Sequence, residues 1–210
     1  MDEIVPDSAE TQRLLQQVRA GAGEALDRLF ARHRPYLSQL VELRLDPKLR
    51  QRVDPSDVVQ EAQLEATRRI DGYLKQPAMP FRLWLRQLAQ DRMLMMRRYH
   101  LGAARRALGR EVALPERSSL VLARQLLARG STPSQQLDRQ ELGRRVRRAV
   151  NELPETDREV LLMRTFEGLS FEEVAYMLQI DAAAARKRHG RALLRLGKIL
   201  AEAGLKESHE

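Results

Sequence analysis

Residues 154–200 decide the fold of this chain; they read PETDREVLLMRTFEGLSFEEVAYMLQIDAAAARKRHGRALLRLGKIL. The pattern predicts a helix over 155–166, a turn, a short helix, a tight turn and a long last helix. Ser170 and Glu173 have the spacing of a capping box at the start of the short helix. Asp181 fits the N-cap of the last helix. The stretch therefore predicts three helices joined by two short turns.

The last of these helices is basic on one face and apolar on the other. No acidic residue occurs between Ala182 and Ala201. The predicted exposed half offers long donors and one methyl group: Ala184, Arg186, Lys187, Arg188, His189 and Arg191. A helix that enters the major groove of DNA needs such donors near its N-terminus. The pattern thus predicts DNA binding, with a basic solvated helix in an ordinary bundle as the alternative.

Composition narrows the classes of function. The chain has 210 residues, enough for one or two domains, and a formal net charge of +8 that favours a polyanionic partner. It has no cysteine and only four scattered histidines, which argues against a disulfide framework and a metal site. The sequence contains no recognisable phosphate-binding loop and no recognisable pair of catalytic nucleophile and base. No apolar run approaches the roughly 18 residues of a membrane span. We therefore expect a cytoplasmic protein that is not an enzyme and carries no cofactor.

The N-terminal half is also predicted to be helical. A first helix is expected from Ser8 or Thr11 to about Leu29, and a second from about Pro35 to Leu45. The sequence 54–57, Asp-Pro-Ser-Asp, is a strong helix start because acids and a proline favour the first turn.

The helix after this start carries an acidic patch in its first half. Asp57, Gln60 and Glu61 precede the first basic residue of that helix, Arg68. Acids near a helix N-terminus also stabilise the helix dipole. The patch is therefore open to two interpretations, a docking face for a basic protein partner or simple capping.

A proline-bounded loop at 72–80 leads into a basic helix that contains the only tryptophan. Phe81, Trp84, Leu85, Leu88 and Met95 are expected to face inward. Cations and aromatic rings suit a single nucleic-acid strand. The candidates for this role are Tyr73, Phe81, Arg82, Trp84, Arg86, Arg92, Arg97 and Arg98. The alternatives are a core role for Trp84 and a solvated basic face.

Proline, glycine and serine mark a linker at 111–135. We therefore predict an all-α protein of two helical domains, residues 10–110 and residues 136–204. A helix from Pro133 or Ser134 to Leu153 is expected to lead into the second domain.

Three markers in this order resemble the extracytoplasmic-function group of bacterial sigma-70 family RNA polymerase sigma factors. DPSDVVQEAQLEA (54–66) is similar to the core-binding helix of that group, and FRLWLRQLAQDR (81–92) to its promoter-melting segment. LPETDREVLLMRTFEGLSFEEVAYML (153–178), running into the basic helix, is the most specific marker. The resemblance covers about residues 20–200. The pieces RRYHLGAARRALGREVALP and STPSQ further resemble a planctomycete-type branch.

The resemblance implies a subunit that binds core RNA polymerase and promoter DNA. Asp57, Gln60 and Glu61 stand where the family contacts the coiled coil of the largest subunit, and the polymerase flap is a further implied contact. The last helix stands where the family recognises the −35 element. The loop 71–80 and the helix after it stand where the family captures a flipped base and the melted strand of the −10 element. The resemblance also admits an anti-sigma factor as a partner.

This sequence departs from the family at several positions that concern DNA. In the promoter-melting segment, Asp91 replaces a common asparagine and Met95 a later aspartate. Gln179 occupies a tight turn that often holds glycine, and Ala183, Ala184 and Ala185 replace a Gly-Thr-Val run. Two other classes of function remain open: a stand-alone helix-turn-helix regulator with a helical sensor or dimerisation domain, and a helical adaptor.

Overall fold

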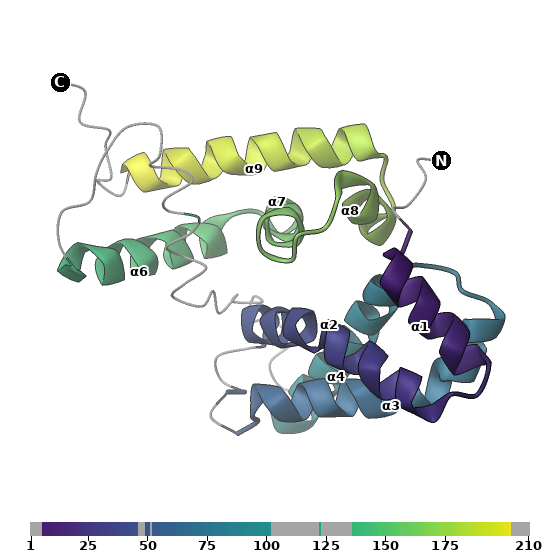
Figure 1. Ribbon diagram of the computed structural model, residues 1–210. Helices are drawn as coiled ribbons and strands as arrows, with labels where there is room; N and C mark the ends of the chain where they lie inside the picture. Colours follow the sequence, from purple (N-terminus) through teal and green to yellow (C-terminus); the bar gives the residue numbers. More distant parts are fainter. Residues whose placement is uncertain (1–5, 46–48, 51, 102–121, 123–135, 203–210) are drawn as a thin grey trace. The chain divides into compact units, whose positions relative to one another are not determined.

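The computed structural model describes residues 6–45, 49–50, 52–101, 122 and 136–202, and within these ranges the regular structure is helical (Figure 1). This confirms the all-α prediction for the described part. The chain divides into two compact units, one formed by the helices before residue 110 and one by those after it. The predicted linker, 111–135, lies almost entirely outside the described residues.

The described residues of the N-terminal unit form four helices: α1 (Ala9–Arg19), α2 (Gly23–Arg44), α3 (Pro55–Lys75) and α4 (Phe81–Leu101). Helix α2 packs against α1, α3 and α4, and α3 packs along α4. The buried core is aliphatic with one aromatic cluster at the start of α4. Its members include Leu29, Leu37, Leu40, Val59, Ala62, Ala66, Tyr73, Phe81, Leu85 and Leu88.

The predicted break between the first two helices was misplaced. Gly21 takes a φ of +84°, a left-handed conformation that glycine adopts without strain, and α1 ends just before it. Helix α2 then runs without interruption through Pro35. A proline inside a helix costs about 3 kcal/mol. Burial of Leu29 and Phe30 before it and Leu37 after it offsets that cost.

The start of α3 follows the prediction. Asp54 is the N-cap, and its Oδ1 accepts a hydrogen bond from the Ser56 N–H at 2.7 Å. In α4, by contrast, Met95 is 54% exposed and Met93 is buried in its place. The expectation that Met95 faces inward was therefore wrong.

The C-terminal unit contains α6 (Gln136–Glu152), α7 (Glu155–Leu161), a π-helical turn η2 (Leu162–Phe166), α8 (Phe171–Leu178) and α9 (Ala182–Glu202). Helix α9, yellow in Figure 1, packs against α6, α7 and α8. The helix predicted over 155–166 thus changes to π geometry at Leu162. The wider turn coincides with burial of Leu162, Met163 and Phe166.

Among the described residues, none of the helices combines the length and the apolar character that crossing a bilayer requires.

Candidate nucleic-acid interfaces and acidic docking face

Side-chain caps set the start of the helix-turn-helix elements. Ser170 Oγ accepts a hydrogen bond from the Glu173 N–H at 3.1 Å, and the Glu173 carboxylate accepts one from the Ser170 N–H at 2.7 Å. This is the predicted capping box. Asp181 Oδ1 accepts from the Ala184 N–H at 2.6 Å, so it caps α9 as predicted.

Helix α9 buries its apolar stripe and presents its basic face. Ala182, Ala185, Ala192, Leu196 and Leu200 are buried in the C-terminal unit. Lys187 is exposed and Arg188 is partly exposed. Neither side chain makes a hydrogen bond or ion pair to another described residue. These two cations are therefore available to an external anion.

Arg186 lies beside them but already has partners on α8. Its Nη2 donates to Glu172 Oε1 at 2.6 Å, and its guanidinium lies 5.4 Å from the centre of the Phe171 ring. Arg164 lies 4.9 Å from the same ring. Phe171 thus packs among cations, and an anion that takes Arg186 competes with Glu172.

His189 belongs to the same cluster. Its ring meets Phe171 edge-on, with ring centres 5.6 Å apart, and its Nε2 lies 3.5 Å from Thr165 Oγ1. Burial, and secondarily the charge of Arg164, lowers the pKa of His189 below its ordinary value. His189 is therefore more readily neutral than a solvent-exposed histidine.

Arg191, placed by sequence with the DNA-contacting residues, binds an acid inside its own unit. Asp157 of α7 is fully buried, and Arg191 Nη2 donates to its Oδ1 at 3.0 Å. Arg195 donates to the other oxygen of the same carboxylate. Asp157 was not among the predicted site residues, because nothing in its local sequence pattern indicates that it faces α9.

Three aromatic residues of the N-terminal unit, Tyr73, Phe81 and Trp84, form one cluster. The Tyr73 and Trp84 rings stack with their centres 4.6 Å apart. The centre of the Phe81 ring lies 5.5 Å from that of Tyr73 and 5.6 Å from that of Trp84. Phe81 is fully buried, Tyr73 is 7% exposed and Trp84 is partly exposed. Burial, aided by the negative charge of Asp7, raises the pKa of the Tyr73 hydroxyl. The structure brings these three residues together, but it does not expose the faces of Tyr73 or Phe81.

The five candidate arginines of α4 have different environments. Arg86 is buried and donates to Gln90 Oε1 at 2.9 Å. Arg92 forms an ion pair with Glu65 of α3, and Arg82 lies 5.3 Å from the centre of the Tyr36 ring. Arg97 is partly exposed and Arg98 is exposed. Of the predicted strand-binding cations, Arg86 therefore does not face solvent.

Apolar side chains accompany the exposed end of α4. Met95 and Tyr99 are 54% and 85% exposed. Tyr99 was not among the predicted strand-binding residues, although a tyrosine next to two arginines is itself a signal for base stacking.

A pocket of about 460 Å³ lies where α1 meets the loop between α3 and α4. One wall is formed by Pro6, Asp7, Gln12, Leu15, Gln16 and Arg19, and the other by Tyr73, Leu74 and Pro77–Pro80. The Tyr73 hydroxyl donates to the Met79 carbonyl at 3.0 Å, which fixes the loop to α3.

The predicted acidic docking residues lie together on α3. Asp57, Gln60 and Glu61 are all exposed, and Leu64, one turn further on, is 59% exposed. Their positions, three and four residues apart, put them on one side of the helix. This side offers two carboxylates and an apolar contact to a partner.

Comparison with known proteins covers nearly the whole chain. The model of the family "Sigma-70, region 4" matches residues 143–196. The chain is 27% identical over 192 residues to the RNA polymerase sigma-H factor of Pseudomonas aeruginosa, covering 91% of this chain and 94% of that protein. It is 29% identical over 181 residues to the ECF RNA polymerase sigma-E factor of Escherichia coli, covering 86% and 89% respectively.

A solved structure, that of CnrH in complex with the cytosolic domain of CnrY, has the same fold. It matches with a TM-score of 0.59 at 24% sequence identity, over 92% of this chain and 99% of that one. These relatives confirm the group suggested by the three sequence markers, and the planctomycete-type branch stays a prediction. Residues 143–196 match the sigma-70 region 4 family, and along about nine-tenths of its length the chain is similar to RNA polymerase sigma factors, among them an ECF sigma-E factor.

Proposed function

We propose that this chain gives core RNA polymerase its promoter specificity by contacting DNA with both units and polymerase with helix α3. The observation that carries the proposal is the basic face of α9, where Lys187 and Arg188 have no partner among the described residues. It lies in the segment that matches sigma-70 region 4. Similarity to sigma factors along about nine-tenths of the chain favours this function over a stand-alone regulator.

The C-terminal unit, residues 136–204, is proposed to recognise the −35 element. Arg186, Lys187 and Arg188 approach phosphates and guanine edges, while the Ala184 methyl group contacts thymine. His189 supports Arg186 through Phe171. Arg191 orients the helix through Asp157.

The N-terminal unit, residues 10–110, is proposed to hold the melted −10 strand. Trp84, Arg97, Arg98 and Tyr99 supply stacking surface and cations. Tyr73, Phe81 and Arg86 shape this surface from beneath, since they are buried. The pocket beside the loop Gln76–Pro80 receives an unstacked base. Extruding a base costs a few kcal/mol, which contacts in the pocket offset.

The acidic side of α3 is proposed to dock on the coiled coil of the largest polymerase subunit, in the cytoplasm. Asp57 and Glu61 pair with basic residues there, Gln60 donates and accepts hydrogen bonds, and Leu64 adds apolar contact. Charge complementarity of this kind sets register and speeds association. The flap of core polymerase and an anti-sigma factor are further proposed partners. The solved structure of CnrH, a protein of the same fold, contains the cytosolic domain of another protein, CnrY.

The decisive experiment is transcription from a promoter library by purified core polymerase, with and without this chain. The wild-type chain is expected to direct initiation at a defined subset of promoters. The double variant Asp57→Arg/Glu61→Arg is expected to lose core binding by at least 100-fold while keeping its fold. Glu24→Arg/Asp27→Arg on α2, an equal reversal of two exposed acids, is the control and is expected to bind core normally. Unchanged core binding by the α3 variant would overturn the docking assignment.

The −35 assignment has its own test. Arg188→Ala is expected to weaken use of promoters that depend on the upstream element by about 10-fold, consistent with roughly 1–3 kcal/mol for a base contact. Non-specific DNA binding is expected to fall much less. Equal losses on specific and non-specific DNA would show that Arg188 touches only phosphates.

A further inference from the structure

A residue ahead of the first helix caps a helix that begins 74 positions later. Both carboxylate oxygens of Asp7 accept hydrogen bonds from the Phe81 N–H, at 3.0 Å for Oδ1 and 2.8 Å for Oδ2. Phe81 is the first residue of α4 and follows Pro80, which has no N–H to donate. A carboxylate is favoured at this end of a helix because the dipole is positive there.

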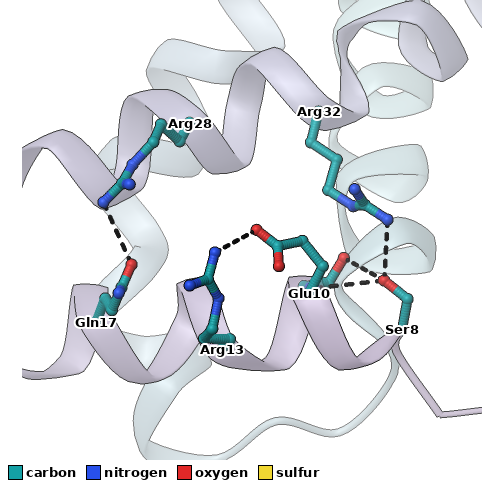
Figure 2. Close-up of polar contacts among 7 residues, drawn as sticks. Ser8, Glu10, Arg13, Gln17, Arg28 and Arg32 are labelled. Atoms are coloured by element: carbon teal, nitrogen blue, oxygen red, sulfur yellow. Dashed lines mark hydrogen bonds and ion pairs between the residues drawn. The ribbon is translucent and has the colours of Figure 1, made fainter.

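The segment that carries Asp7 is itself held in place. Gln12 Nε2 donates to the Asp7 carbonyl at 2.9 Å. Figure 2 shows two guanidinium groups of α2 reaching across to α1: Arg32 donates to Ser8 Oγ and Arg28 to Gln17 Oε1, both at 3.3 Å. Helix α1 is therefore fixed to α2 at both of its ends.

The same segment also binds the other side of the loop. Arg19 Nη2 donates to the Leu74 carbonyl at 2.5 Å, just before α3 ends. The loop Gln76–Pro80 is thus bounded by Arg19 where it leaves α3 and by Asp7 where it enters α4. Both residues also line the pocket of about 460 Å³ beside that loop.

We propose that Asp7 is a positioning residue for −10 recognition: it holds the loop Gln76–Pro80 and the start of α4 in the geometry that receives the unstacked base. This inference rests on the proposed function, which assigns the loop and its pocket to the melted strand. It makes the segment 6–19 a part of the −10 recognition apparatus. Asp7 acts through the backbone of Phe81, since both of its carboxylate oxygens bind that N–H.

The test uses holoenzyme assembled from core polymerase and the full chain, with Asp7→Ala and Asp7→Asn. Asparagine keeps one oxygen that can accept from the Phe81 N–H, but without the charge. Permanganate reactivity of −10 thymines is therefore expected to fall about 10-fold in the alanine variant and about threefold in the asparagine variant. Core affinity is expected to stay within twofold of wild type. The matched control is Glu10→Ala, since Glu10 is an acid of the same segment that pairs with the exposed Arg13 (Figure 2).

The decisive measurement is the ratio of initiation at the preferred −10 sequence to initiation at a variant −10 sequence. A variant that is merely less stable would keep the wild-type ratio, because its folded molecules would still discriminate normally. Wild type is expected to prefer its own −10 bases, and Asp7→Ala is expected to lose most of that preference. If Trp84 fluorescence shows that Asp7→Ala fails to fold, the discrimination ratio of Asp7→Asn tests the proposal instead. Wild-type discrimination in the deciding variant, or equal behaviour of the Asp7 and Glu10 variants, would overturn the proposal. Failure of the proposed function is distinct: the wild-type chain would then direct no promoter-dependent initiation.

Discussion

Asp157 of α7 is fully buried, and its Oδ1 accepts a hydrogen bond from Arg191 of α9 at 3.0 Å. Arg195 donates to the other oxygen, so one carboxylate binds two successive turns of α9. The arginine side chains are 50% and 47% exposed, and their outer edges stay in water. The two ion pairs of Asp157 with Arg191 and Arg195 therefore fix the rotation of α9 about its own axis and determine which α9 residues face outward.

Asp157→Asn is expected to destabilise the C-terminal unit by about 2 kcal/mol. Removing one member of a buried ion pair costs about 3–5 kcal/mol, and half-exposed arginines reduce that because water solvates their charges. Hydrogen exchange at α7 and α9 measures the effect, with α3 as an internal reference. Glu141→Gln removes a half-exposed acid that pairs with two arginines of α6 and is expected to leave exchange unchanged. Wild-type protection in Asp157→Asn would show that the pair contributes little.

Glu172→Gln is expected to raise affinity for promoter DNA about threefold. The substitution releases Arg186 from an acid that competes with phosphate. One further phosphate contact also steepens the dependence of log affinity on log salt by about 0.9. Fluorescence anisotropy of the full chain on a selected promoter fragment measures both quantities, and Glu141→Gln controls for the change in net charge. Weaker binding would instead mean that Glu172 orients Arg186 toward DNA.

The parts of this fold that the sequence predicted are those set by neighbours in the chain. The caps by Asp54, Ser170 and Asp181 join a side chain to a backbone N–H no more than three residues away. Such contacts depend on local spacing, and the sequence displays that spacing directly. The break at Gly21 was missed because proline is a stronger helix breaker than glycine, so the break was predicted near Pro35. Helix α2 continues through Pro35 because its side chains are buried against elements distant in sequence, which local spacing does not reveal.

The candidate site was predictable to the level of helix faces and not beyond. Arg86 and Arg98 are arginines of the same predicted basic helix, yet Arg86 is buried and Arg98 is exposed. Asp7 and Asp157 were missed because their partners lie 74 and 34 residues away. A basic stripe shows where a helix carries cations, but the fold decides which of them are already paired.

Protonation of His33 is expected to destabilise the N-terminal unit. His33 Nε2 lies 3.2 Å from Thr11 Oγ1, and its ring meets Phe81 edge-on. Burial, with smaller contributions from Arg32 and Arg82, lowers its pKa from 6.5 to about 4. The unfolded chain therefore takes up a proton before the folded one does, so the stabilisation is complete above pH 6.5 and is lost progressively toward pH 4.

Between pH 7.5 and 5.5 this linkage is worth about 1.4 kcal/mol, in a range where most carboxylates stay ionised. Urea unfolding followed by the fluorescence of Trp84, the single tryptophan, measures it. In His33→Gln, which cannot titrate, the difference in unfolding free energy between the two pH values is expected to shrink by about that amount. An equal pH dependence in both proteins would assign the effect to other groups.

Gln179→Gly is expected to stabilise the C-terminal unit. Gln179 ends α8 with a φ of +53°, and the Ile180 N–H bonds the Ala175 carbonyl at 3.0 Å in the manner of a Schellman motif. A side chain in this left-handed conformation costs about 1 kcal/mol, which glycine avoids.

The gain is expected to be smaller than that cost, about 0.5 kcal/mol, because glycine also makes the unfolded chain more flexible. Gly168→Ala provides the opposite case. Gly168 has a φ of +66° and open space around the missing Cβ, so only backbone strain opposes alanine there. The Gly168→Ala variant is expected to lose about 1 kcal/mol of unfolding free energy. Thermal unfolding by circular dichroism, with Trp84 emission reporting the N-terminal unit separately, measures both variants. The same sign of change for both would show that backbone strain does not control these two turns.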